Sequence, residues 1–228
     1  MDKLLLGAEA LAFLDREGFR VLACSVAGDE DEAAETASKM GFPVALKVSS
    51  PDVIHKTETG GIRIWLKSEA EVRQAFREIV AVFRSGSPGK RLDGVMVQKQ
   101  GSGFELIVGA RKDRQFGPVL MFGLGGIHAE AIRDVSFRLI PVTTRDAGEM
   151  IEQLRGYEAL KNPRNGTVEI PCVADFLVQV SGLIEKHPEI EEMDLNPVFV
   201  ASRNIEVCDA RIRTGWMNQA LGMATLKS

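Results

Sequence analysis

The fold is decided by the stretch Phe116-Gly117-Pro118-Val119-Leu120-Met121-Phe122-Gly123-Leu124-Gly125-Gly126. The apolar run over 118–122 predicts a buried strand. The glycines that follow predict a tight turn, which either lets backbone N–H groups face phosphates or simply lets two backbones pack closely. The turn does not fit the Rossmann fingerprint, because His128 stands where Gly or Ala is required, and the chain contains no Gly-Lys-Ser/Thr of a P-loop.

Helical and strand periods alternate on both sides of this stretch, which is typical of an α/β protein. Strands 94–100 and 104–110, separated by Gly101-Ser102-Gly103, predict a hairpin, and the loop 85–89 is a candidate lobe junction. The other expected strands are 20–25, 43–48, 61–66, 135–142, 193–200 and 204–211, and the expected helices are 9–17, 29–40, 68–83, 146–154 and 173–185.

Composition excludes several classes of function. The 228 residues carry 28 Lys and Arg against 32 Asp and Glu, so no basic surplus points to nucleic acid or to an anionic membrane. The longest uncharged stretch, 115–129, is too short and too rich in glycine to span a bilayer. Three widely spaced cysteines without a C-x-x-C pattern, and a poor match to a secretory signal, predict reduced thiols and a cytoplasmic protein.

Two basic residues near the N-terminus are candidates for phosphate chemistry. Lys47 stands near the end of the apolar strand 43–48, where an unpaired ammonium is costly to bury, so it either meets an anion or reaches solvent along its stem. His55 lies in the polar loop 49–61 between two strands. Because imidazole is a competent nucleophile, this histidine either accepts a phosphoryl group or is an ordinary solvated loop residue.

Acidic and amide side chains gather in the last two expected strands. Alternation places Glu192, Asp194 and Asn196 on one face, and a hairpin with 204–211 would bring Asp209 near them. Carboxylate and carboxamide oxygens suit Mg²⁺, which takes further ligands from phosphates and water. Solvent-facing polar residues are the alternative.

Three separated segments, in this order, resemble the ATP-grasp β subunit of NDP-forming acyl-CoA synthetases, such as ADP-forming acetyl-CoA synthetase. They are Ser50-Pro51-Asp52-Val53-Ile54-His55-Lys56-Thr57 with Gly60-Gly61, the stretch 116–126, and Asp194-Leu195-Asn196-Pro197 with Asp209-Ala210-Arg211. The likeness runs from about Glu9 to Arg211. The chain departs from the family at His128, where an aromatic residue is common, and at 156–166, where Gly-x-Arg-Gly is usual.

The resemblance implies an ATP-grasp fold, with the nucleotide in a cleft between two lobes. The lobes would be 1–92, with the histidine loop 49–61, and 93–214, followed by a tail at 215–228. His55 matches a transiently phosphorylated histidine, and Glu130 an acidic position near the glycine turn, whereas His128 is expected to be structural. The residues implied to contact ATP are Lys47, Gln98, Lys99, Glu105, Gly125 and Gly126; those implied to hold Mg²⁺ are Asn196 and Asp209, with Asp194 beside them.

The implied function is that of a ligase subunit. It would interconvert acyl-CoA, ADP and phosphate with carboxylic acid, coenzyme A and ATP through a phosphohistidine relay. We expect an α partner that carries the CoA-binding and ligase domains and a second phosphohistidine, in an α2β2 complex without nucleic acid or membrane. A carboxylate-amine ligase, which would not need His55, and a nucleotide-sensing subunit are the alternatives.

Overall fold

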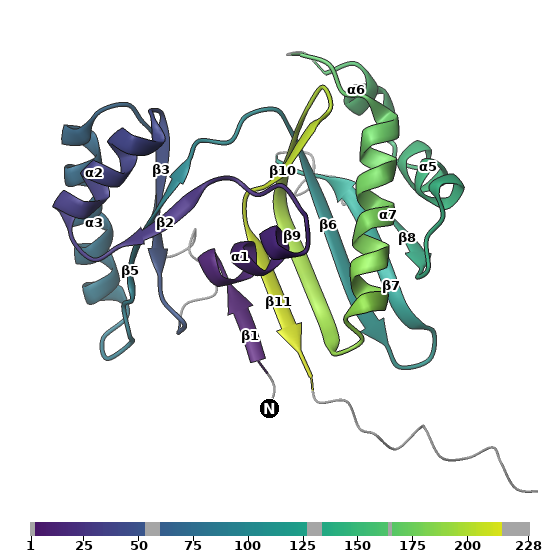
Figure 1. Cartoon of the computed structure of the whole chain (residues 1–228), viewed down its shortest axis with the longest axis horizontal. Helices are drawn as coiled ribbons and strands as arrows, with labels where there is room; N and C mark the ends of the chain where they lie inside the picture. The colour runs from purple at the N-terminus through teal and green to yellow at the C-terminus, as the bar shows by residue number, and fades with distance from the viewer. Residues whose placement is uncertain (1–2, 53–59, 127–133, 164–165, 216–228) are drawn as a thin grey trace, which may run out of the picture. The chain divides into compact units, whose positions relative to one another are not determined.

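The computed structural model describes residues 3–52, 60–126, 134–163 and 166–215, and the chain divides into two compact units (Figure 1). The N-terminal unit contains residues 6–103 together with 206–209. The C-terminal unit contains the described residues of 1–5, 104–205 and 210–228. The chain therefore enters the N-terminal unit at residue 6, leaves it after residue 103, and returns to it only for the short segment 206–209.

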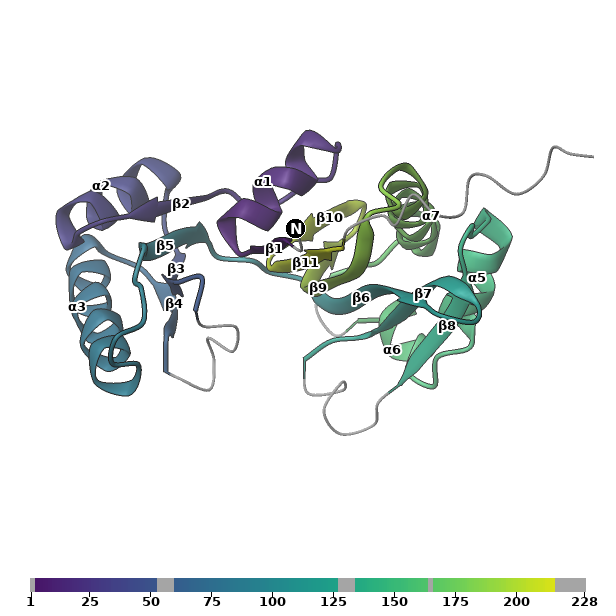
Figure 2. The ribbon, with the colours of Figure 1, turned by 90° about the horizontal axis from the view of Figure 1, so that it is seen from below.

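The N-terminal unit is an antiparallel sheet with two of its three helices packed on one face. The strand order is β2 (Cys24–Ala27), β5 (Gly94–Lys99), β3 (Val44–Ser49) and β4 (Ile62–Leu66). The helices are α1 (Ala8–Arg16), α2 (Glu30–Met40) and α3 (Glu69–Gly86), of which α2 and α3 lie side by side against the sheet (Figures 1 and 2).

Alternation along the strands sends one set of side chains to these helices and another set to the opposite face. Leu46 and Val97 belong to the buried cluster that includes alanines of α2, and the small alanine side chains let the helix approach closely. Helices α2 and α3 start where the chain supplies a cap: the Asp29 carboxylate accepts from the N–H groups of Asp31 and Glu32, and the Ser68 hydroxyl accepts from that of Glu71.

The C-terminal unit is a seven-stranded sheet with α5 and α7 over β7 and β8 (Figure 2). The strand order is β1 (Lys3–Leu6), β11 (Ala210–Thr214), β9 (Ile190–Ala201), β6 (Phe104–Asp113), β7 (Gly117–Leu124) and β8 (Val135–Leu139), and β10 (Asn204–Val207) also pairs with β9. The helices are α5 (Thr144–Glu152), α6 (Tyr157–Lys161) and α7 (Ile170–Lys186).

The five predicted helices are confirmed, but the predicted hairpin of 94–100 with 104–110 is wrong. β5 pairs with β2 and β3 in one sheet, whereas β6 pairs with β7 and β9 in the other. The units accordingly divide between residues 103 and 104, later than the expected junction at 92 and 93. The expected strand 204–211 is interrupted after Val207, which separates β10 from β11.

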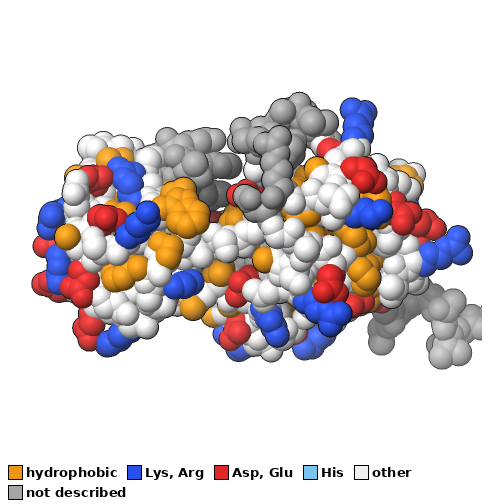
Figure 3. Space-filling model, turned by 90° about the horizontal axis from the view of Figure 1, so that it is seen from above, with side chains coloured by type: hydrophobic (Ala, Val, Ile, Leu, Met, Phe, Trp, Pro, Cys, Tyr) orange, Lys and Arg blue, Asp and Glu red, His pale blue; other side chains and the backbone are white. Residues whose placement is uncertain are grey.

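Surface and cysteine chemistry agree with the composition. The face drawn in Figure 3 carries acidic and basic side chains interspersed. All three cysteines, Cys24, Cys172 and Cys208, are free thiols, as predicted. Within the described ranges, none of the helices has the length and apolar character that crossing a bilayer requires.

Candidate functional site

Lys47 lies in the middle of β3, on the sheet face opposite α2 and α3, and only 6% of it is exposed. Its ammonium donates to the thiol sulfur of Cys208, with Nζ and Sγ 3.4 Å apart. A neutral sulfur is a weak acceptor and does not compensate a buried positive charge. The geometry therefore suits the first alternative for this lysine, in which an anion meets the ammonium.

Gln98 lies on the same face of the sheet as Lys47, because it is two residues from Met96, the cross-strand partner of Lys47. Gln98 is fully buried, and its Nε2 donates to the Cys208 carbonyl oxygen across 2.9 Å. The Cys208 sulfur in turn donates to Oε1 of Gln98 at 3.6 Å. Cys208 thus connects two of the predicted nucleotide contacts.

Lys99 follows Gln98 on β5, so its side chain leaves the opposite face of the strand. Its ammonium donates to the carbonyl oxygens of Gly41 and Phe42, at 2.6 and 3.4 Å. These carbonyls lie at the C-terminal end of α2, where a cation is favoured by the helix dipole. The structure therefore places Lys99 at a helix terminus and away from the contacts of Lys47.

In the C-terminal unit, the structure brings Glu105, Gly125 and Gly126 together. The N–H of Gly125 donates to the carbonyl oxygen of Glu105 at 2.7 Å. A Cβ atom on Gly125 would stand 2.8 Å from the Cβ of Glu105, and one on Gly126, whose φ is +64°, would stand 3.2 Å from a Glu105 carboxylate oxygen. The predicted tight turn is confirmed, and both glycines are required by space or by backbone conformation.

The predicted metal ligand Asn196 lies in β9 of the C-terminal unit, and Asp209 precedes β11, in the segment assigned to the N-terminal unit. Ala210, the residue after Asp209, pairs with Leu195, the residue before Asn196. Asp194 pairs with Arg211 on one side and with Gly109 on the other. The described residues contain no cluster of three or more His, Cys, Asp or Glu side chains, so a cation here would depend on amide, carboxylate, phosphate and water oxygens.

Arg211 is a candidate that the sequence analysis did not select. Its Nε is buried and, among the described residues, has no hydrogen-bond partner. A buried donor without an acceptor is costly, so this guanidinium is available to an anion. The signal was present in the segment Asp209-Ala210-Arg211, where a basic residue stands two positions after a predicted metal ligand. His55, His128 and Glu130 lie outside the described residues.

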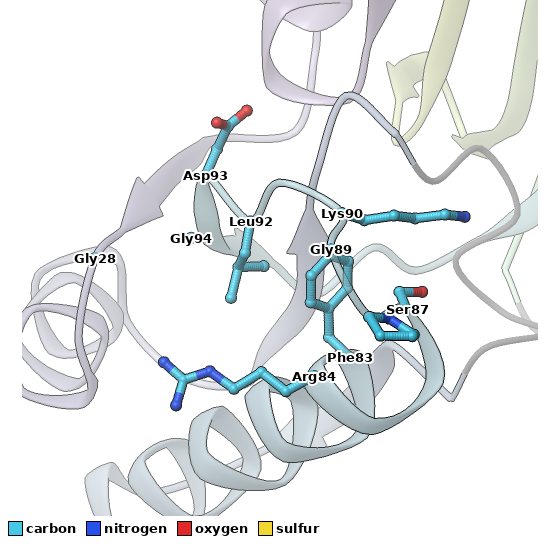
Figure 4. Close-up of a pocket in the computed structure, with 10 residues that line it drawn as sticks. Gly28, Phe83, Arg84, Ser87, Gly89, Lys90, Leu92, Asp93 and Gly94 are labelled. Carbon is cyan, nitrogen blue, oxygen red and sulfur yellow. The ribbon is translucent and has the colours of Figure 1, made fainter.

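A cavity of about 340 Å³ opens in the N-terminal unit between the C-terminal end of α3 and the start of β5 (Figure 4). Arg84 and Lys90 bring positive charge to it and Asp93 negative charge. It is lined by Gly28, Phe83, Arg84, Ser87, Pro88, Gly89, Lys90, Leu92, Asp93 and Gly94. None of the predicted site residues is among these lining residues, so the cavity is separate from the chemistry described above.

A family model described as an ATP-grasp domain matches residues 1–214. The beta subunit of ADP-forming acetate–CoA ligase I from Pyrococcus furiosus is 41% identical over 210 residues, which cover 91% of this chain and 90% of that protein. ADP-forming acetate–CoA ligase I from Archaeoglobus fulgidus is 43% identical over 213 residues, covering 92% of this chain but 31% of that protein. The chain therefore spans less than a third of the Archaeoglobus relative's length.

Two solved structures of dinucleotide-forming acetyl-coenzyme A synthetase 1 from Ca. Korarchaeum cryptofilum are similar to this chain. One, in complex with coenzyme A and Ca-AMPCP, has a TM-score of 0.89 at 41% identity and covers 93% of this chain and 94% of that chain. The other, in complex with coenzyme A and Mg-AMPPCP, has a TM-score of 0.79 at 40% identity, with 93% of each chain covered. In the latter, the phosphohistidine segment points towards the nucleotide binding site.

Proposed function

This chain belongs to the ATP-grasp β subunits of ADP-forming acyl-CoA synthetases, and we propose that it is the nucleotide-binding part of such an enzyme. The expected ATP-grasp fold is confirmed by the family model and by the solved structures. The proposed reaction interconverts acyl-CoA, ADP and phosphate with a carboxylic acid, coenzyme A and ATP. Relatives named as acetate–CoA ligases support this reaction class.

The observation that carries the proposal is the buried Lys47 ammonium, whose acceptor is a thiol. In a water-poor site, such a cation stabilises phosphate oxygens far more than an exposed lysine would. The glycine turn packs directly against Glu105, so Gly125 and Gly126 place this carboxylate beside the turn that is proposed to face the nucleotide. The Arg211 Nε, which has no hydrogen-bond partner within the described ranges, is a further donor for an anion.

The donor set also fits a divalent cation. Asn196 supplies an amide oxygen and Asp209 a carboxylate, and both are hard oxygen ligands of the kind that Mg²⁺ prefers. Bound Mg²⁺ would neutralise phosphate charge during transfer. A structural neighbour contains Mg-AMPPCP, which supports this assignment.

His55 is the proposed phosphoryl acceptor. An imidazole nitrogen forms a bond to the γ-phosphorus of ATP while the bond to the bridging oxygen breaks and ADP leaves; the imidazole N–H proton passes to solvent. The phosphoryl group then moves to an α partner, which would hold coenzyme A, the ligase site and a second phosphohistidine in an α2β2 complex. The free thiols support a reducing, cytoplasmic setting for that complex.

Phosphorylation of the full chain by γ-³²P-labelled ATP and Mg²⁺ tests this function. We expect acid-labile label on the wild type and none on His55→Ala, whereas both proteins bind ATP equally well. His187→Ala is the matched control, because the His187 ring lies 3.0 Å from the Glu189 carboxylate in the C-terminal unit and should not affect labelling. ATP binding without labelled histidine would instead indicate a nucleotide sensor, and amine-dependent ATP turnover without label a carboxylate-amine ligase.

A further inference from the structure

We propose that Cys208 is a positioning residue that holds the Lys47 ammonium where the nucleotide phosphates bind, and that Gln98 holds Cys208. This inference rests on the proposed function and adds a residue to its phosphate site. It depends on contacts within the N-terminal unit, to which all three residues belong. Nothing in the sequence places Cys208 beside Lys47, because 161 positions separate them.

The position of the sulfur is fixed by its backbone. The N–H of Val207 donates to the Arg20 carbonyl oxygen, and the Val207 carbonyl accepts from the N–H of Leu22, both at 3.0 Å. The Cys208 carbonyl accepts from Gln98 Nε2 at 2.9 Å. The segment 206–209 is thus held in the N-terminal unit by the backbone N–H and carbonyl of Val207 and by the carbonyl of Cys208. The thiol therefore has little freedom to move.

A thiol is a hydrogen-bond acceptor of suitable strength for positioning the Lys47 ammonium. A carboxylate at position 208 would pair with the buried ammonium through a short, charge-assisted hydrogen bond, and a phosphate would have to displace it. A neutral sulfur orients Nζ by a weak bond and leaves the positive charge uncompensated. The ammonium has three N–H donors, so it keeps the sulfur contact and still donates to a phosphate oxygen.

In this arrangement Gln98 affects ATP binding indirectly, without contacting the nucleotide itself. Its side chain is fully buried, and both ends of its amide engage Cys208. Gln98 therefore acts through Cys208 and Lys47 on the phosphates. Because the contact made by Lys47 concerns phosphate and not the base, the three residues should affect binding of ATP and leave binding of adenosine unchanged.

Calorimetric binding of Mg-ATP and of adenosine to the full chain tests the inference. We expect Cys208→Ala to weaken ATP binding about tenfold, because an unrestrained Lys47 side chain must be ordered when the phosphates bind. Adenosine binding should stay the same, and Cys208→Ser should recover part of the ATP affinity because its hydroxyl still accepts a hydrogen bond. Cys172→Ala, which removes a thiol from α7 in the other unit, is the control.

A double-mutant cycle with Lys47→Ala supplies the decisive readout. If Cys208 acts through Lys47, the double variant Lys47→Ala/Cys208→Ala has an ATP dissociation constant within about twofold of that of Lys47→Ala alone. Additive effects, or equal losses for adenosine and ATP, would overturn the positioning role. Thermal unfolding without nucleotide shows whether each variant is folded, and Cys208→Ser keeps the comparison possible if the alanine variant is not. A wild-type chain that binds no ATP would overturn the proposed function itself.

Discussion

The N–H of Gly125 donates to the carbonyl oxygen of Glu105 across 2.7 Å, and this bond joins the glycine turn to the start of β6. The approach is so close that a Cβ on Gly125 would stand 2.8 Å from the Cβ of Glu105 and 3.0 Å from its carbonyl carbon. The turn and the strand therefore fit together only because Gly125 has no side chain, so this glycine is required for packing.

Gly125→Ala should destabilise the chain by about 1–3 kcal/mol, because backbone atoms of Glu105 cannot move aside cheaply. ATP affinity should fall with it as the turn shifts. Gly148→Ala is the control: a Cβ there meets nothing within 4 Å, so this helical substitution should stabilise the chain by about 0.5–1 kcal/mol. Urea unfolding measures both, and equal effects of the two substitutions would contradict the packing argument.

Asp134 links the end of the glycine-turn region to α6. Its carboxylate accepts from the N–H groups of Arg155 and Gly156, at 2.9 and 2.7 Å, and the residue is 9% exposed. Asp134→Ala leaves both donors without their acceptor and should cost about 1–3 kcal/mol in the free energy of unfolding. Asp175→Ala, on the exposed side of α7, should change it by less than about 0.5 kcal/mol. A loss no larger at Asp134 than at Asp175 would refute the linking role.

Asn196→Ala tests the proposed metal site. With one oxygen ligand removed, the Mg²⁺ concentration that half-saturates ATP binding should rise about tenfold, the lower end of the range seen when a metal environment is altered. Adenosine binding without metal should not change. Asn162→Ala, at the C-terminal end of α6, removes an amide that bonds Glu158 and serves as the control. An unaltered Mg²⁺ dependence would remove Asn196 from the site.

The decrease in unfolding free energy at acidic pH should depend in part on Asp146. The pKa of this carboxyl is lowered, first by the Thr143 hydroxyl that donates to it and then by the Thr143 N–H. Its contribution is therefore present above the carboxyl's ordinary pKa and is lost as pH falls through the lowered value. Asp146→Asn keeps an acceptor but removes the charge, so the difference in unfolding free energy between the two proteins should shrink in acid. A pH-independent difference would exclude this assignment.

Local signals predicted α2 and α3 well because their caps lie in the sequence next to them. Asp29 and Ser68 precede the apolar periods of α2 and α3 and bond their first-turn N–H groups. The strand β5 shows where local reasoning stops. Its neighbours are β2 and β3, and a short Gly-Ser-Gly link to β6 is no guide to that pairing.

Strand pairing decides which of the predicted site residues lie together. Glu105 and the glycine turn, both predicted to contact ATP, are in contact in the structure, while their role in binding stays a prediction. The partner of Lys47 was not foreseen, since Cys208 looks in the sequence like an ordinary small buried residue. The thiol reaches Lys47 only because the segment 206–209 returns to the N-terminal unit.

This return has a consequence for protein synthesis. A ribosome produces Lys47 161 residues before Cys208, so the whole second sheet except β11 is translated before the thiol emerges. Until then the N-terminal unit lacks the segment that bonds Arg20, Leu22 and Gln98. The nascent chain thus acquires its oriented lysine late, and release of a prematurely terminated chain would yield a product without that arrangement.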